Sequence, residues 1–101
     1  MASTDSFMLQ LRGEIDMARS QELAALVDDY DRTMARHVVI DLSEVTFCDS
    51  QGLTFLVRMN SIARERDGDV TLVNTPGTIQ NLLRITRLDG RFRYEERVFL
   101  P

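Results

Sequence analysis

The sequence contains no lysine, because all 12 of its basic residues are arginine. Without lysine the chain cannot form a Schiff base, and it has neither the phosphate-binding lysine of a P-loop nor the lysine of a protein kinase. A nucleotide-binding protein with weak hydrolytic activity would therefore have to work without these groups. Failure to bind ATP or GTP at millimolar concentration would exclude that function.

Cysteine and histidine each occur once, as Cys48 and His37. One cysteine forms no internal disulfide bond, and the pair is too small for a Cys/His zinc cluster. A Ser-His-acid triad would have to use His37, which opens the run "HVVIDL" and is expected at a strand start. Cys48 is expected to be a small buried thiol. We predict no catalytic residue, no metal and no cofactor, and hence a protein that is not an enzyme.

Long apolar runs and clustered positive charge are also missing. No run approaches the roughly 20 residues that a membrane-spanning helix needs. The start, "MASTDSFMLQ", lacks a secretion signal, so we expect a cytoplasmic protein with no membrane partner. The formal net charge of −4 argues against direct binding to nucleic acid, which needs a clustered basic face. The length of 101 residues predicts one domain, residues 1–101.

Hydrophobic periodicity predicts four strands. The period of two in "SFMLQLRGEID" predicts a first strand that ends at Gly13. The β-branched run over residues 37–42 predicts a central strand that is covered at least partly on both faces. A third strand is expected over residues 69–74, and a short last strand in "RFRYEE" with a tail in "VFL".

Helical spacing predicts three helices between these strands. Helices are expected over residues 18–34 and 51–66, and a third one follows the break at Thr75-Pro76-Gly77, where Thr75 or Thr78 would be the cap. The third helix is indicated by the stripe of Ile79, Leu82, Leu83 and Thr86. The alternation of strands and helices places the chain in the α/β class, with crossovers onto a sheet that contains parallel strands.

The second helix carries apolar residues on two nearly opposite sides. The two groups are Leu53, Leu56, Val57 and Asn60 on one side, and Phe55, Met59 and Ile62 on the other. One interpretation is that neighbouring helices or the tail cover the second group. The other is that the second group forms an exposed patch that binds a protein partner.

The segment "FCDSQGLTFL", residues 47–56, places an Asp-Ser pair directly before the second helix. Serine and aspartate are favoured at helix N-caps because their oxygens accept hydrogen bonds from first-turn N–H groups. Ser50 is therefore either a cap or a residue whose modification controls partner binding. Asp49 is expected to orient or cap the turn, and Gly52 fits a place where the backbone passes closely.

The stretch "VVIDLSEVTFCDSQGLTFL" resembles the signature segment of the STAS domain, particularly that of the bacterial anti-sigma factor antagonists. In that family an apolar strand ending in Asp-Leu-Ser leads to Asp-Ser-x-Gly-Leu and an amphipathic helix. "GEID" and "DVTLVNTPGTIQNLLRITRLDGRF" resemble further family segments, although Arg87 stands where the family often has glycine. The resemblance implies a single STAS domain, with a mixed β-sheet of about four to five strands and helices mainly on one face.

The resemblance implies a function in transcription regulation by partner switching. The unphosphorylated protein would bind an anti-sigma factor, a serine kinase with a histidine-kinase-like ATPase fold, and so free the sigma factor. That kinase would phosphorylate Ser50 and end binding, and a metal-dependent PP2C-type phosphatase would restore it. The residues expected at the partner surface are Asp16, Asp49, Ser50, Gln51, Gly52, Phe55, Met59 and Ile62.

A second function remains open, that of a small STAS subunit of a membrane phospholipid-transport complex that docks on its ATPase. The Asp-Ser-x-Gly motif favours the sigma regulator without excluding this subunit. Neighbouring genes for a histidine-kinase-like ATPase and a sigma factor would indicate the first function, and transport genes the second.

Overall fold

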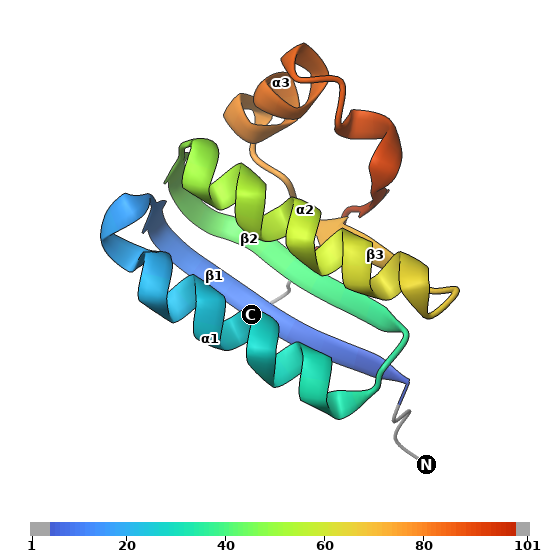
Figure 1. The fold of residues 1–101 in the computed structure, drawn as a ribbon. Coiled ribbons are helices and arrows are strands. Elements are labelled where there is room, and N and C mark those ends of the chain that lie inside the picture. The colour runs from blue at the N-terminus through green and yellow to red at the C-terminus, as the bar shows by residue number, and fades with distance from the viewer. Residues whose placement is uncertain (1–4, 99–101) are drawn as a thin grey trace.

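Four strands form one sheet in the order β1-β2-β3-β4 (Figure 1). The computed structural model describes residues 5–98. The strands are β1 (Ser6–Ile15), β2 (His37–Cys48), β3 (Asp69–Val73) and β4 (Arg93–Glu95). Every neighbouring pair among them is parallel, whereas a mixed sheet was expected. The reason is that a helical segment follows each of the first three strands and returns the chain to the same end of the sheet.

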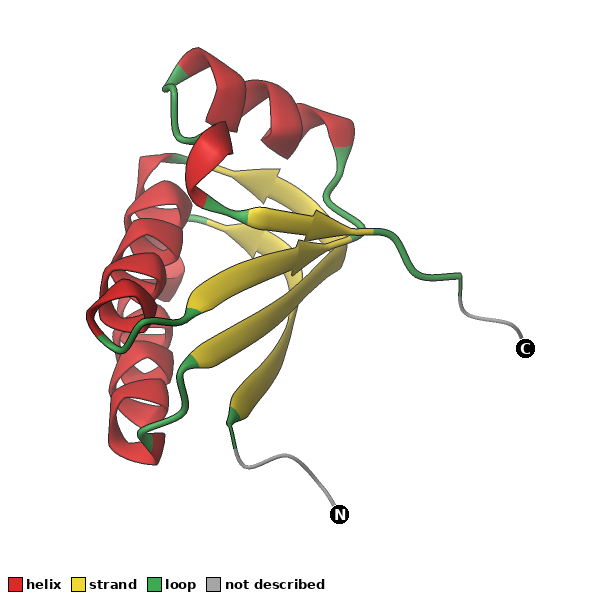
Figure 2. Cartoon of the chain, turned by 90° about the vertical axis from the view of Figure 1, so that its right-hand side faces the viewer, coloured by secondary structure: helices red, strands yellow, loops and turns green. Residues whose placement is uncertain are grey.

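The helices lie mainly on one face of this sheet (Figure 2). They are α1 (Ser20–Thr33), α2 (Ser50–Glu65) and α3 (Gly77–Ile85), with short 3-10 helices η1 (Met17–Arg19) and η2 (Asp89–Arg91). The α/β class and the alternation of strands and helices predicted from the sequence are confirmed. None of the helices within residues 5–98 is long and apolar enough to cross a membrane.

The first strand does not end at Gly13. Gly13 has a φ of +73°, and the pairing of β1 with β2 shifts register on both sides of it. Glycine reaches this left-handed conformation without strain, so it forms an irregularity inside the strand rather than a stop. The guanidinium of Arg19 donates hydrogen bonds to the carbonyl oxygens of Arg12 and Glu14 and holds the irregular segment against η1. As a result β1 continues to Ile15, which pairs with Cys48 at the end of β2.

The core lies between the sheet and the helices, and it includes residues that were candidates for an exposed patch. Phe55 is 2% and Met59 0% exposed, and Ile62 is half-buried. The interpretation in which Phe55 and Met59 belong to an exposed patch is therefore wrong. The residues that α2 buries are Gly52, Phe55, Leu56, Met59, Asn60 and Ala63, a stripe with helical spacing.

The position of α2 explains why its second apolar group is covered. It lies between α1 and α3 above the sheet (Figure 1). Ile79 of α3 lines the same small internal cavity as Phe55. Leu53 and Val57, from the first apolar group, are the residues left half-buried. Coverage by neighbouring elements, the first of the two interpretations, is the correct one for Phe55 and Met59.

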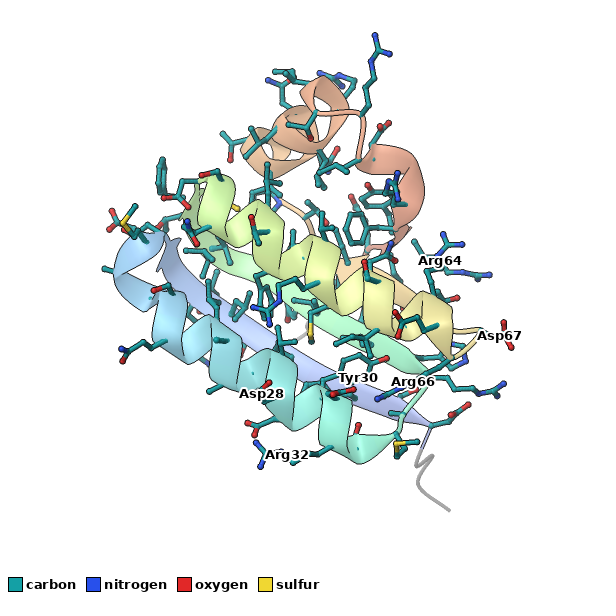
Figure 3. All side chains as sticks on the ribbon, in the orientation of Figure 1. Asp28, Tyr30, Arg32, Arg64, Arg66 and Asp67 are labelled. Atoms are coloured by element: carbon teal, nitrogen blue, oxygen red, sulfur yellow. The ribbon has the colours of Figure 1, made fainter. Side chains whose placement is uncertain are left out.

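The C-terminal ends of α1 and α2 are joined through Arg66. Its guanidinium lies 5.0 Å from the centroid of the Tyr30 ring, and it donates hydrogen bonds to Ala35 O (3.0 Å) and Asp31 Oδ1 (2.7 Å). Figure 3 shows Arg66 and Tyr30 directed toward one another, while Asp67 projects away from the fold. Burial raises the pKa of the Tyr30 phenol. This contact fixes the end of the helix pair that is remote from Ser50.

Neither threonine caps the third helix. Pro76 occupies the N-cap position of α3, and no side chain makes a capping hydrogen bond there. After the helix, Arg87 has a φ of 62°, and the N–H of Leu88 donates to Leu83 O at 2.8 Å. This left-handed position is the one that glycine usually fills at a helix end. Most of the predicted "VFL" tail lies outside the described residues.

The burial of Met59 predicts a large difference between two methionine variants. Met59→Ala should lower the free energy of unfolding by about 2–5 kcal/mol, because it leaves a cavity in the core. Met8→Ala is the matched control, since Met8 is 66% exposed and its change should stay within about 0.5 kcal/mol. Urea unfolding measures both. Equal stabilities would contradict the placement of α2.

Candidate functional site

Asp49, not Ser50, caps the second helix. Its Oδ1 accepts hydrogen bonds from the backbone N–H of Gln51 (2.8 Å) and of Gly52 (3.4 Å). These are two of the first-turn donors that a helix leaves without an internal partner. The backbone at Asp49 is extended, so β2 passes into α2 through this single residue. The cap leaves Ser50 as the first helical residue.

The Ser50 side chain is consequently not needed to start the helix. Ser50 is exposed, and its carbonyl oxygen accepts a hydrogen bond from Thr54 Oγ1 at 2.9 Å. Within residues 5–98 its hydroxyl has no hydrogen-bond partner. Serine and aspartate are both favoured at the N-cap, and here Asp49 takes that place. The Ser50 hydroxyl therefore faces solvent at the first turn of α2.

Gly52 marks a close approach of α2 to the ends of two strands. A Cβ atom at this position would lie 2.4 Å from Cys48 Sγ and 3.2 Å from the carbonyl oxygen of Ile15. Real Cβ atoms do not tolerate the first of these distances, so a side chain here would force either the Cys48 sulfur or the helix to move. The glycine of the Asp-Ser-x-Gly motif is thus required by packing, as the sequence indicated.

Two capping aspartates lie at the same end of the sheet. The N–H of Asp49 donates to Ile15 O at 3.2 Å, which joins the ends of β1 and β2. Asp16 follows Ile15 and caps η1, accepting a hydrogen bond from the N–H of Ala18 at 3.0 Å. The structure thus brings the predicted Asp16 together with the segment 49–52. Phe55 and Met59 face the core instead, and Ile62 lies further along α2.

The charge at this end of the sheet is negative. Asp16 and Asp49 contribute two carboxylates, and the nearby Arg19 forms a 2.6 Å ion pair with Glu22. That hydrogen-bonded pairing raises the pKa of Arg19 and lowers the pKa of Glu22. Among the described residues no ion pair joins Asp49 to an arginine. A further negative charge at Ser50 would therefore lie beside an uncompensated carboxylate.

Cys48 is a packing residue of this turn. It is half-buried, and its Sγ lies 3.6 Å from the carbonyl oxygen of Asp49. Burial, with a smaller contribution from the Asp49 charge, raises the pKa of the thiol to about 11. The thiol is therefore protonated at neutral pH and is a weak nucleophile.

His37 cannot serve Ser50 as a base. It lies at the start of β2, and Ser50 follows the other end of that strand, roughly 35 Å away for a 12-residue strand. The Nδ1 atom of His37 lies 2.9 Å from Asp69 Oδ1. In the described part of the chain no three His, Cys, Asp or Glu residues are placed to hold a metal ion.

Sequence reasoning missed the apolar residues that are exposed near Ser50. Phe47 is 50%, Met17 68% and Ile85 69% exposed. A signal for Ile85 was present, because it lies outside the buried stripe of the third helix. The signal for Phe47 was weaker. Alternation along β2 does not show whether a neighbouring element covers the Phe47 side chain.

The chain matches known proteins over nearly its whole length. The family described as "Mlab, STAS domain" matches residues 2–100. A STAS-domain containing protein of Pseudomonas aeruginosa (strain UCBPP-PA14) is 24% identical over 94 residues, which cover 91% of this chain and 90% of that protein.

Solved structures share the fold at low sequence identity. The unphosphorylated anti-sigma factor antagonist SpoIIAA has a TM-score of 0.74 at 15% identity, covering 98% of this chain and 86% of that one. Phosphorylated SpoIIAA of Bacillus has a TM-score of 0.75 at 16% identity, covering 97% and 87%. The STAS domain of a SulP transporter of Vibrio cholerae has a TM-score of 0.66 at 19% identity, covering 98% and 78%.

The capping geometry predicts different costs for neighbouring substitutions. Asp49→Ala should lower the free energy of unfolding by about 1 kcal/mol, because two first-turn N–H groups lose their acceptor. Ser50→Ala should change it by less than about 0.5 kcal/mol, since the hydroxyl makes no contact that the fold needs. Chemical unfolding of both variants tests this. A larger loss for Ser50→Ala would identify Ser50 as the cap.

The raised pKa of Cys48 predicts slow alkylation. At pH 8 the thiolate fraction of a group with a pKa of about 11 is on the order of a hundredfold below that of an ordinary cysteine. The rate of reaction with iodoacetamide should rise about tenfold per pH unit from pH 8 to 10 while the fold persists. Denatured protein provides the reference rate. Equal native and denatured rates at pH 8 would show that the thiol is not shielded.

Proposed function

The chain belongs to the STAS domain family, and from this premise we propose that it is an anti-sigma factor antagonist switched by phosphorylation of Ser50. The unphosphorylated form binds an anti-sigma factor, a serine kinase with a histidine-kinase-like ATPase fold, and frees the sigma factor for transcription. The kinase phosphorylates Ser50 and ends the complex, and a PP2C-type phosphatase reverses the modification. In this cycle the protein is a cytoplasmic binding partner and substrate, not an enzyme.

The observation that carries this proposal is the division of roles between Asp49 and Ser50. Asp49 supplies the helix cap, and the exposed Ser50 hydroxyl is left without an internal partner. A kinase can therefore reach the hydroxyl without first breaking a contact of the fold. Phosphorylation likewise removes no hydrogen bond on which α2 depends.

Electrostatics supports a switch that acts on binding. A phosphate adds about −1.5 to −2 charges at pH 7. The N–H groups of Gln51 and Gly52, which would otherwise receive an anion, are already hydrogen-bonded to the Asp49 carboxylate. These two N–H groups are therefore not available to stabilise the phosphate, and its charge acts on an approaching partner. Repulsion and desolvation at such an interface cost a few kcal/mol, on the order of a hundredfold in affinity.

The comparisons are compatible with this local effect. The fold of this chain agrees about equally with unphosphorylated and with phosphorylated SpoIIAA, with TM-scores of 0.74 and 0.75. A phosphorylated protein of this fold thus keeps an arrangement that this chain also has. This supports loss of binding without a change of fold.

A second candidate is a small STAS subunit of a membrane transport complex that docks on its ATPase. The likeness in fold to the STAS domain of a Vibrio cholerae SulP transporter favours it. In that role the surface around Ser50 would bind a permanent partner, and Ser50 would remain unmodified. Phosphorylation state and neighbouring genes separate the two functions.

Intact mass spectrometry tests the proposal most directly. Protein isolated from its own cells should carry one phosphoryl group that phosphatase treatment removes and that fragment mapping places on Ser50. The Ser50→Ala variant, expressed in the same cells, should lack it. Absence of phosphorylation under several growth conditions would contradict the switch and favour the transport subunit.

Binding to the cognate kinase gives a second test. Ser50→Ala should bind like the wild type and remain bound in the presence of ATP, whereas Ser50→Asp should bind on the order of a hundredfold more weakly. Ser61→Asp is the control, because Ser61 is also exposed on α2 but lies about 16 Å further along the helix. Equal affinities of Ser50→Ala and Ser50→Asp in a titration would rule out the switch.

A further inference from the structure

An apolar groove lies beside the Ser50 site. It has a volume of about 330 Å³ and separates the end of β2 from α3. Its apolar lining consists of Phe47, Cys48, Ile79, Leu82 and Ile85, and the described residues that complete it are neutral. Phe47 is 50% and Ile85 69% exposed, so much of this apolar surface faces solvent.

The groove follows from the unequal lengths of the strands. β2 pairs with β3 only as far as Asp41, whereas it pairs with β1 as far as Cys48. Residues 42–48 of β2 therefore have no strand on the β3 side, and side chains of α3 line the groove beside this stretch. Ile85, the last residue of α3, lies outside the buried pair of Ile79 and Leu83. Phe47 and Ile85, the two exposed apolar residues of the groove, thus lie in a strand and in a helix.

We propose that this groove docks an apolar segment of the kinase that phosphorylates Ser50, with Phe47 and Ile85 as its anchoring contacts. The inference rests on the proposed function and adds the surface by which the kinase is recognised. Continuity with the proposed phosphorylation site supports the kinase as the occupant. Cys48 lines the groove and also contacts the first turn of α2, where Gly52 packs against its sulfur. Because Cys48 precedes Ser50 by only two residues, a kinase that covers Ser50 also lies near the groove.

The neutral lining defines the chemistry of the docking segment. A charged side chain buried there would lose its hydration without gaining a counter-charge, so the segment presents aliphatic or aromatic side chains. The Asp16 and Asp49 carboxylates lie at the Ser50 side instead. The surface thus separates apolar recognition in the groove from electrostatic switching at Ser50. Apolar anchors of this kind carry a large share of the affinity of protein interfaces.

Ser50 phosphorylation in an extract of the protein's own cells, supplied with ATP, tests the docking. Purified wild type, Phe47→Ala and Ile85→Ala are added over a range of concentrations, and the rate is followed by intact mass. Each groove variant should react roughly tenfold more slowly at low concentration and recover at saturation, because docking and not chemistry is impaired. Met8→Ala and Met34→Ala, at positions 66% and 73% exposed elsewhere, should react like the wild type. Unchanged thermal unfolding confirms that each variant folds.

The outcomes separate the docking from the function on which it rests. If wild-type Ser50 is not phosphorylated in the extract, the proposed function fails and the docking inference falls with it. If the wild type and both groove variants react at equal rates at every concentration, the docking inference is overturned and the switch stands. Sedimentation completes the test: a wild-type dimer that Phe47→Ala dissociates would assign the groove to a second copy of the chain and overturn the kinase as its occupant.

Discussion

The close approach of Gly52 to Cys48 and Ile15 is the constraint on which the Ser50 site depends. It allows a single residue, Asp49, to connect β2 to α2, with the first turn of the helix against the ends of two strands. The short connection in turn places the Asp49 carboxylate under the first-turn N–H groups. A larger residue at position 52 would force the Cys48 sulfur or the helix start to shift. The exposure of Ser50 is therefore a consequence of packing beneath it.

A second glycine brings the first strand to the same place. Gly13 takes its left-handed φ next to one of two register shifts, at each of which β2 carries an extra residue opposite β1, and the strand continues to Ile15, which pairs with Cys48. At this point the carbonyl oxygen of Ile15 accepts a hydrogen bond from the N–H of Asp49. Arg19 satisfies carbonyl oxygens that the distorted strand leaves open. The two glycines thus act at different distances from Ser50 but position the same turn.

The sequence contained enough information for the order of elements and for the motif, but not for exposure. The period of two and the helical stripes predicted each strand and helix, and Asp-Ser-x-Gly located the turn. Periodicity could not say that α1 and α3 flank α2, and so it left Phe55 and Met59 open to a wrong interpretation. The sequence predicts a strand end at Gly13, because glycine occurs both at strand ends and at irregularities within strands. The tertiary pairing decides between these roles.

The location of the Ser50 hydroxyl determines what a charge placed there can affect. Side chains that support the fold at this turn, Asp49 and Cys48, point to the helix start and into the packing between strand and helix. The hydroxyl points to neither, so an added charge changes few internal contacts and is screened by solvent in the free protein. When a partner excludes this solvent, repulsion between the added charge and nearby carboxylates becomes stronger. The same modification is therefore tolerated by the isolated fold and opposed by a complex, which is the asymmetry that a binding switch needs.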